Sequence, residues 1–293
     1  MTILDAIIQG ILQGLAEFLP ISSSGHLSVY QHFAGITDQA LSATVFLHLG
    51  TLFAVFAAVN KQLWELIAEL GLTIKDIFTG KFRLKDMTPR RRMLLMLILS
   101  CLMLAVILPV KDQIEGLVGD GDIIVEGVCL LFTAVLILIG SRLAVPKNSG
   151  KTAGNMRAGD AVLIGLAQAV ATLPGVSRSG STISASLMLG YDREYAFDYS
   201  FILGTPAVLL ATALEIKDAV QGNIEINVLP VFIGIAIAAV VGYFAIKFLA
   251  KTVRSGAFRY FGWYCTVVGL LVIAAGLTEK ISGQPLGALL GLQ

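Results

Sequence analysis

The sequence predicts an all-α polytopic membrane protein, in which six transmembrane helices and two re-entrant helical hairpins form an inverted-topology repeat. Three observations lead to this prediction: an apolar composition, an uneven placement of basic residues, and two matching segments that lie 155 residues apart. Of the 293 residues, 56% are hydrophobic and 14% are charged, and the mean hydropathy is +0.82. A soluble globule of this length is less apolar. We therefore expect a single integral membrane domain, residues 1–293.

The six expected spans are apolar runs that are long enough, or nearly so, to cross a hydrocarbon core of about 30 Å. They cover residues 40–59, 93–109, 123–144, 197–215, 228–246 and 260–277. Cys101, Cys129 and Cys265 lie singly within these runs, without metal-ligand spacing, and are expected to be packing residues. The N-terminus has no basic region before its apolar run, so we expect no removable signal peptide.

Residues 3–34 and 160–190 differ from the spans. Each is an apolar helix-like run that is broken by a polar Pro/Ser/Gly turn and followed by a second, short apolar run. A broken backbone at membrane depth is tolerated only where protein or a water-filled cavity covers it. We therefore expect two re-entrant hairpins, each of which enters and leaves the membrane on one side.

The basic residues predict the orientation. The segments 61–92, 142–160, 190–196 and 247–259 together hold 17 of the 21 Lys and Arg residues. If these segments are cytoplasmic, the positive-inside rule is satisfied, and both termini and the first hairpin lie outside. The run "PRRR" at 89–92 is expected to fix this topology, with contact to anionic lipid as the second interpretation. A net charge of +1 gives no reason to expect a nucleic-acid partner.

An internal repeat accounts for the two hairpins. At an offset of 155, "GILQGLAEFLPISSSG" (10–25) lies over "GLAQAVATLPGVSRSG" (165–180), and the Gly, Gln and Ser residues match in order. The two repeats cover about 1–145 and 156–280, and each holds one hairpin and three spans. An odd number of crossings inverts the second copy, and broken helices in such proteins meet around a site near the midplane.

The first hairpin contains a polar cluster. Gln13 and Glu17 are four residues apart, on one face of a helix. A carboxylate at membrane depth is costly and usually faces a cavity, a cation or a partner. Ser22, Ser23 and Ser24 form the tip, where backbone N–H groups of the following helix can point at an anion.

Three histidines follow this cluster. His26 adjoins the serines, and a serine with a histidine and a glutamate is the set that activates a hydroxyl or carries a proton. We expect His32 and His48 to be packing residues.

The second tip is expected to bind an anion. Arg178 stands between Ser177 and Ser179, just before a helix that is expected to begin near Thr182. A guanidinium suits phosphate because its fork is bidentate and always charged. The sequence holds no Walker loop, HExxH, Rossmann fingerprint or GxSxG elbow, which argues against nucleotide or zinc chemistry.

Both tips resemble one family. "QGLAEFLPISSSGH" (13–26) resembles the (E/Q)xxxE segment that runs on to a serine and a histidine in the undecaprenyl-diphosphate phosphatase, or bacitracin-resistance protein, family. "PGVSRSGSTI" (174–183) resembles the family's PGxSRSxxT segment, and the resemblance covers essentially the whole chain. It implies an enzyme of the bacterial cytoplasmic membrane that removes the terminal phosphate of the C55 isoprenoid diphosphate with a divalent cation, Mg²⁺ or Ca²⁺. This reaction regenerates the carrier of cell-wall precursors.

By motif position, the resemblance implies that Glu17 is the essential acid and metal-site carboxylate, and that Ser23 and His26 are the catalytic pair. Arg178 would hold the diphosphate. Many family members have Glu where Gln13 stands, which puts a two-carboxylate metal site in doubt, although Gln can give one neutral oxygen to a hard cation. The further substrate-binding candidates are Ser22, Ser24, Ser177, Ser179 and Thr182.

Several alternatives stay open at this point. Either Ser23 attacks phosphorus with His26 as proton carrier, or His26 attacks and Ser23 positions. An inverted-repeat transporter or a flippase for a polyprenyl phosphate would also need an arginine and an apolar groove, but a serine and a histidine at one tip favour an enzyme. The expected partners are the polyprenyl diphosphate and membrane lipids, with a homodimer as the oligomer to test. The site is expected to face the outer side.

Overall fold

The computed structural model describes residues 2–36, 46–83, 87–106, 109, 123–221 and 227–286. Within these ranges the chain forms helices and no strand. In chain order the elements are α1 (Ile3–Ala16), α2 (Ser23–Ala34), α4 (Leu47–Phe78), α5 (Pro89–Leu102), the 3₁₀ turn η1 (Met103–Val106), α7 (Ile124–Leu143), the 3₁₀ turn η3 (Ala153–Asn155), α8 (Ala158–Val170), α9 (Arg178–Met188), α10 (Arg193–Gln221), α11 (Val228–Arg254) and α12 (Arg259–Ser282).

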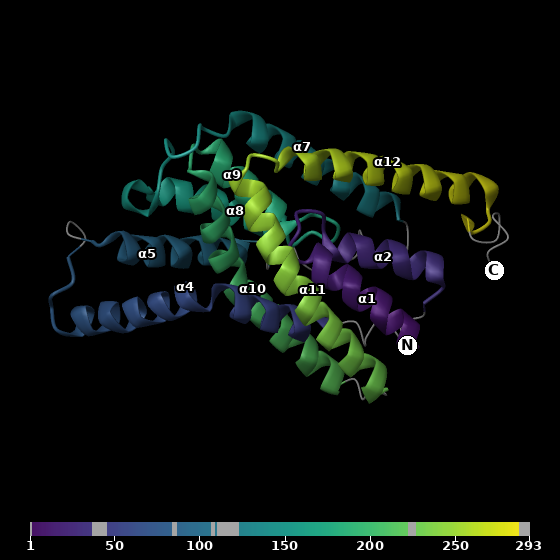
Figure 1. Cartoon of the computed structure of the whole chain (residues 1–293), viewed down its shortest axis with the longest axis horizontal. Coiled ribbons are helices and arrows are strands. Elements are labelled where there is room, and N and C mark those ends of the chain that lie inside the picture. Colours follow the sequence, from purple (N-terminus) through teal and green to yellow (C-terminus); the bar gives the residue numbers. More distant parts are fainter. Residues whose placement is uncertain are drawn as a thin grey trace.

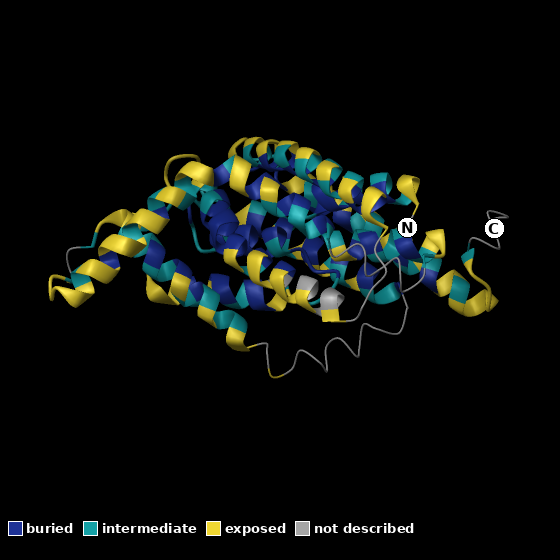
Figure 2. Ribbon diagram, turned by 90° about the horizontal axis from the view of Figure 1, so that it is seen from below, coloured by how far each residue is buried: buried dark blue, intermediate teal, exposed yellow. Residues whose placement is uncertain are grey.

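Most helices gather in one body. Figure 1 shows α7 and α12 side by side along one edge of this body, with α10 and α11 crossing it and α11 beside α1. The later part of α4 and the start of α5 extend away from it as an arm. Figure 2 shows buried residues concentrated in the body and exposed residues along the arm.

Four helical segments are long and apolar enough to cross a membrane by length and composition: Ile124–Leu143, Arg193–Leu214, Val228–Arg254 and Arg259–Ser282. They coincide with the expected spans 123–144, 197–215, 228–246 and 260–277. Large apolar side chains point outward from them, as at Phe244 and Trp263, which are 63% and 58% exposed. Such faces suit a lipid solvent. The chain is therefore an all-helical protein with several apolar helices of membrane-spanning character.

The other two expected spans differ in detail. The span 40–59 begins outside the described residues and enters α4, which continues beyond the expected end to Phe78 with a kink at Val59 (φ −122°, ψ 20°). The span 93–109 falls on α5, which ends at Leu102. The count of six spans stays a prediction.

Most of the segment that follows the first of these spans is helical, because α4 continues to Phe78. Charged and apolar residues alternate along the second half of α4, so one face can turn to α5. Arg91 of α5 pairs with Glu69 and Asp76 of α4, each at 2.8 Å. The hydrogen bonds between Arg91 and these two carboxylates raise the pKa of the guanidinium above its ordinary value. Arg91 of the "PRRR" run therefore ties α4 to α5.

Both expected hairpins are pairs of helices separated by a non-helical turn, α1 with α2 and α8 with α9. Their tips are capped in the same way: the Oγ atoms of Ser22 and Ser177 accept the N–H of Gly25 and Gly180, each at 3.2 Å. A side-chain oxygen at this position stabilises the first turn of a helix. The local match at an offset of 155 is thus visible in the capping hydrogen bonds.

Glycines let each hairpin approach a helix of the other half of the chain. A Cβ on Gly10 of α1 would lie 2.7 Å from the Gly234 carbonyl of α11. A Cβ on Gly165 of α8 would collide with the backbone of Ser100 on α5. Helices pack this closely only where side chains are small. The inverted repeat, and the depth of the hairpins in the membrane, stay predictions.

Candidate functional site

The two hairpin tips touch. The backbone N–H of Gly175 donates to Ser24 Oγ at 3.1 Å, which joins the second tip to the first. The backbone N–H of Ser177 donates to Thr133 Oγ1 of α7, also at 3.1 Å, and this bond is buried. The tips therefore meet as expected, against α7.

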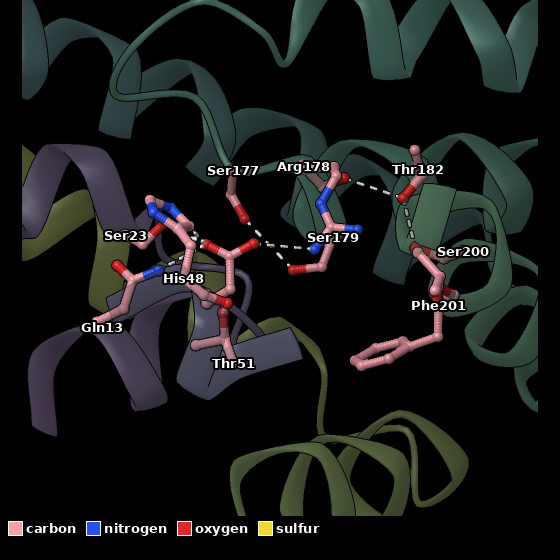
Figure 3. Close-up of polar contacts among 12 residues, drawn as sticks. Gln13, Ser23, His48, Thr51, Ser177, Arg178, Ser179, Thr182, Ser200 and Phe201 are labelled. Carbon is pink, nitrogen blue, oxygen red and sulfur yellow. Dashed lines mark hydrogen bonds and ion pairs between the residues drawn. The ribbon is translucent and has the colours of Figure 1, made fainter. Parts of the chain in front are cut away.

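Glu17 is at the centre of the polar cluster, where α1 ends, and its side chain is only 9% exposed. Its Oε2 accepts a hydrogen bond from Ser23 Oγ at 2.8 Å and one from Gln13 Nε2 at 3.3 Å. Its Oε1 accepts one from Arg178 Nη2 at 3.2 Å. Figure 3 shows Gln13, Ser23 and His48 close together, with Arg178 opposite them. The structure thus brings together four of the predicted site residues.

Arg178 is the first residue of α9, and its guanidinium lies against Gly204 of α10. A Cβ on Gly204 would overlap with Arg178 Nη1, so the absence of a side chain at this position makes room for the guanidinium. Thr182 Oγ1 donates to the Arg178 carbonyl at 2.9 Å and also bonds to Ser200 Oγ of α10 (Figure 3). The Thr182 hydroxyl therefore connects the backbone of Arg178 to α10.

The tip serines are held in several ways. Ser22 has a positive φ of 70° with ψ 108°, which is uncommon for a residue other than glycine and marks local strain. Its Oγ lies 3.3 Å from Ser24 Oγ. In the second tip, Ser177 Oγ lies 3.5 Å from Ser179 Oγ. Each tip therefore holds a pair of neighbouring hydroxyls, while Ser23 is the tip serine that bonds to Glu17.

Within the described part of the chain, the ring nitrogens of His26 bond to neither Ser23 nor Glu17. Its Nδ1 lies 2.9 Å from the Ser22 carbonyl, and its Nε2 lies 2.9 Å from the hydroxyl of Tyr264 on α12. We did not predict a site role for Tyr264 from the sequence, because a tyrosine within an apolar run is usually a packing or interfacial residue.

His48 and His32 have polar partners, which we did not expect of packing residues. His48 Nε2 lies 3.9 Å from Glu17 Oε2, so α4 also contributes to the cluster. His32 Nε2 lies 2.8 Å from Glu279 Oε2 near the end of α12. Sequence alone could not place either partner, because both contacts join distant segments.

Glu126 is a second buried carboxylate that the sequence analysis missed. It lies in the first turn of α7, is 6% exposed, and its Oε1 accepts a hydrogen bond from Ser28 Oγ at 2.7 Å. Gly175 packs against its backbone: a Cβ there would lie 3.3 Å from Glu126 Cα. An isolated acid at the start of an apolar run was the available signal.

The cluster offers oxygen atoms to a hard cation. The amide oxygen of Gln13 is buried and accepts no hydrogen bond in the described part of the chain, and it belongs to the residue that bonds to Glu17. Mg²⁺ and Ca²⁺ prefer carboxylate, amide and hydroxyl oxygens. Within the described ranges no three His, Cys, Asp or Glu residues gather as metal ligands. The residues present therefore fit a cation held by few protein ligands.

The geometry can support phosphoryl chemistry. A hydroxyl that donates to a carboxylate has a base beside it, and a guanidinium next to both can bind a phosphate oxygen. The site lies at the turns of two broken helices, from which Glu17, Ser23 and Arg178 all project.

Comparison with known proteins gives a consistent result. Residues 6–271 match the model of the family described as bacitracin resistance protein BacA. A protein of Methanobrevibacter smithii named undecaprenyl-diphosphatase is 36% identical over 283 residues, covering 95% of this chain and 99% of its own. One of Alkaliphilus metalliredigens with the same name is 38% identical over 280 residues, with 94% and 100% coverage. A third, from Halothermothrix orenii, is 37% identical over 276 residues, with 93% and 98% coverage.

Proposed function

The chain belongs to the bacitracin resistance protein BacA family, and on this premise we propose that it is an undecaprenyl-diphosphatase. It hydrolyses undecaprenyl diphosphate to undecaprenyl phosphate and inorganic phosphate. This reaction recycles the lipid carrier for peptidoglycan synthesis and gives bacitracin resistance. The observation that carries the proposal is the contact of Glu17 with both Ser23 and Arg178, a base, a hydroxyl and a phosphate-binding cation in one cluster.

Ser23 is the nucleophile in this proposal. Its hydroxyl already donates to Glu17 Oε2 at 2.8 Å, so Glu17 can accept the proton as Ser23 Oγ bonds to the terminal phosphorus. The anhydride P–O bond breaks, and undecaprenyl phosphate leaves with its bridging oxygen. Water then attacks the phosphoserine, inorganic phosphate leaves, and Ser23 regains its proton. His26, the other residue of the catalytic pair, is the proton carrier in this second step. The alternative, in which His26 attacks phosphorus, is less well supported because both ring nitrogens of His26 face other partners.

Arg178 binds the phosphate groups. Its Nη2 bonds to Glu17 Oε1. A diphosphate carries more negative charge than one carboxylate, and a guanidinium binds two of its oxygens in a fork. Charge spreads over the equatorial oxygens as the anhydride bond breaks, so Arg178 stabilises the transition state. The hydroxyls of Ser22, Ser24, Ser177 and Ser179 are the further donors.

Glu17 and Gln13 are the residues that would hold a divalent cation, Mg²⁺ or Ca²⁺. A bound cation would neutralise charge on the diphosphate. The buried Gln13 oxygen, which accepts no hydrogen bond from the described residues, supports this assignment. Gln13 contributes a neutral oxygen, so the site carries one negative charge less than a pair of glutamates would.

The membrane arrangement is part of the proposal. The chain has six spans and two re-entrant hairpins in a cytoplasmic membrane, with both termini outside and the site open to the outer leaflet. The basic residues support this orientation, since 17 of 21 lie in the four segments taken as cytoplasmic. The arm of α4 and α5, which carries Arg90 and Arg91, is one of these segments (Figure 1).

The test is release of inorganic phosphate from undecaprenyl diphosphate by the purified protein in detergent, with and without a chelator. We expect release that depends on the divalent cation. If the protein releases no phosphate but moves a labelled polyprenyl phosphate across vesicle membranes, it is a flippase instead.

A further inference from the structure

The ring of His26 is held between two elements from opposite ends of the chain. Nδ1 lies 2.9 Å from the carbonyl oxygen of Ser22, in the turn before α2. Nε2 lies 2.9 Å from the hydroxyl of Tyr264 on α12, 238 residues away. The two rings also stack, with centroids 5.7 Å apart and planes at 12°. Position and plane of the imidazole are therefore both constrained.

These contacts fix the hydrogen-bond roles of the neutral ring. A carbonyl oxygen can only accept, so Nδ1 carries the proton and donates it to Ser22. In that tautomer Nε2 has the lone pair and accepts a hydrogen bond from the Tyr264 hydroxyl. The bond to Ser22 selects the tautomer. With that bond alone the imidazole could still turn about the Cβ–Cγ bond, so the bond to Tyr264 selects the orientation of the ring.

A second contact joins the same part of α12 to the first hairpin. The thiol of Cys265, the next residue, lies 3.5 Å from the carbonyl oxygen of Pro20 in the turn of this hairpin. Two consecutive residues of α12 thus reach the tip, one at Pro20 and one at His26. Cys265 is buried, whereas Tyr264 is 43% exposed. Packing alone therefore explains Cys265 better than it explains Tyr264.

We propose that Tyr264 is a positioning residue for the reaction, which acts through His26. Its hydroxyl keeps Nε2 of His26 in one direction and the imidazole in one orientation beside the serine tip. The inference deepens the proposed function and rests on it, because His26 is one of the two residues of the catalytic pair.

The experiment compares Tyr264→Phe with Tyr260→Phe. The first variant keeps the stacking ring and loses the hydroxyl. The second is a matched control one turn earlier on α12, where the tyrosine is 61% exposed and its ring faces Arg259, with 5.3 Å from Cζ to the ring centroid. The chain has three histidines, so the ¹⁵N signals of His26 can be assigned in detergent by replacing His32 and His48 one at a time.

In the wild-type protein we expect a protonated Nδ1 and an Nε2 whose signal shows a hydrogen bond. Tyr264→Phe should move the Nε2 signal towards that of a nitrogen without this hydrogen bond. It should also lower kcat/KM roughly five- to tenfold, which corresponds to the free energy of one neutral hydrogen bond. Tyr260→Phe should change neither quantity.

Two results would overturn the proposal: His26 signals that are unchanged in Tyr264→Phe, or changed signals with wild-type turnover. The NMR readout does not depend on substrate. A wild-type protein without phosphatase activity would contradict the proposed function, whereas unchanged signals would contradict the role of Tyr264 alone.

Discussion

The guanidinium of Arg178 and the carboxylate of Glu17 lie 3.2 Å apart, although 161 positions separate them in the chain. Each residue belongs to the turn of a different broken helical pair. Two such turns can form an ion pair only where they lie at the same level along the helix bundle. Other helices must then cover the backbone of both turns. The contact therefore defines the place where the diphosphate is expected to bind.

Arg178→Lys should lower kcat/KM by roughly 10- to 100-fold while the protein keeps its fold. Lysine retains the charge, but its ammonium cannot reproduce the two parallel hydrogen bonds of a guanidinium to phosphate. The measurement is the initial rate of phosphate release from a prenyl diphosphate. Arg259→Lys, at an exposed position on α12, is the control and should keep the wild-type rate. Equal rates for both variants would show that Arg178 acts only as a charge.

Ser23→Ala separates the two candidate nucleophiles. If Ser23 attacks phosphorus, the variant should lose nearly all turnover, whereas a serine that only donates a hydrogen bond should leave on the order of a hundredth to a thousandth of the rate. Ser186→Ala, in the buried part of α9, is the control. The trapped adduct gives an independent answer: we expect it to be stable to acid and labile to base, as for a phosphoserine. The opposite stability would identify His26.

Gln13→Glu tests the proposed cation site. A second carboxylate beside Glu17 would strengthen the binding of a hard cation, so the variant should keep or raise activity and need less divalent cation for half-maximal rate. Titration of chelated protein with Mg²⁺ and with Ca²⁺ measures this requirement. Wild-type activity that resists the chelator would remove the cation from the proposal.

Two cysteine variants test the orientation in a background without Cys101, Cys129 and Cys265. Ser282→Cys, at the end of α12, should react with an impermeant thiol reagent in intact cells, because this end is proposed to be outside. Lys81→Cys, after α4, should react only when the cells are opened. Both positions are exposed, so access to the reagent decides the result. The reverse pattern would contradict the outward-facing site.

The sequence predicted the local features of the site well. The spacing of Gln13 and Glu17 placed both on one helix face, and they do form a hydrogen bond. The Pro/Ser/Gly turns predicted where the helices break, and Ser22 and Ser177 do cap the helices that follow. Such features depend on a few neighbouring residues, so periodicity and turn chemistry suffice to find them.

Contacts between distant segments were harder to predict. His48 was expected to pack, yet α4 brings it to 3.9 Å from Glu17. Tyr264 and Glu126 are single polar residues in apolar runs, and only the crossing of α12 and α7 with the hairpins gives them partners. The helical course of α4 to Phe78 depends on pairing with α5, which a count of apolar residues does not detect.

The most direct test of the central claim is the initial rate of phosphate release from undecaprenyl diphosphate, measured side by side for the wild-type protein and Glu17→Gln in detergent with divalent cation. Glutamine has nearly the same size as glutamate, but it cannot accept the Ser23 proton or offer a charged oxygen to a cation. We predict one phosphate released for each undecaprenyl phosphate formed by the wild type, and no measurable release by the variant. Release at equal rates by both proteins, or by neither, would contradict the account.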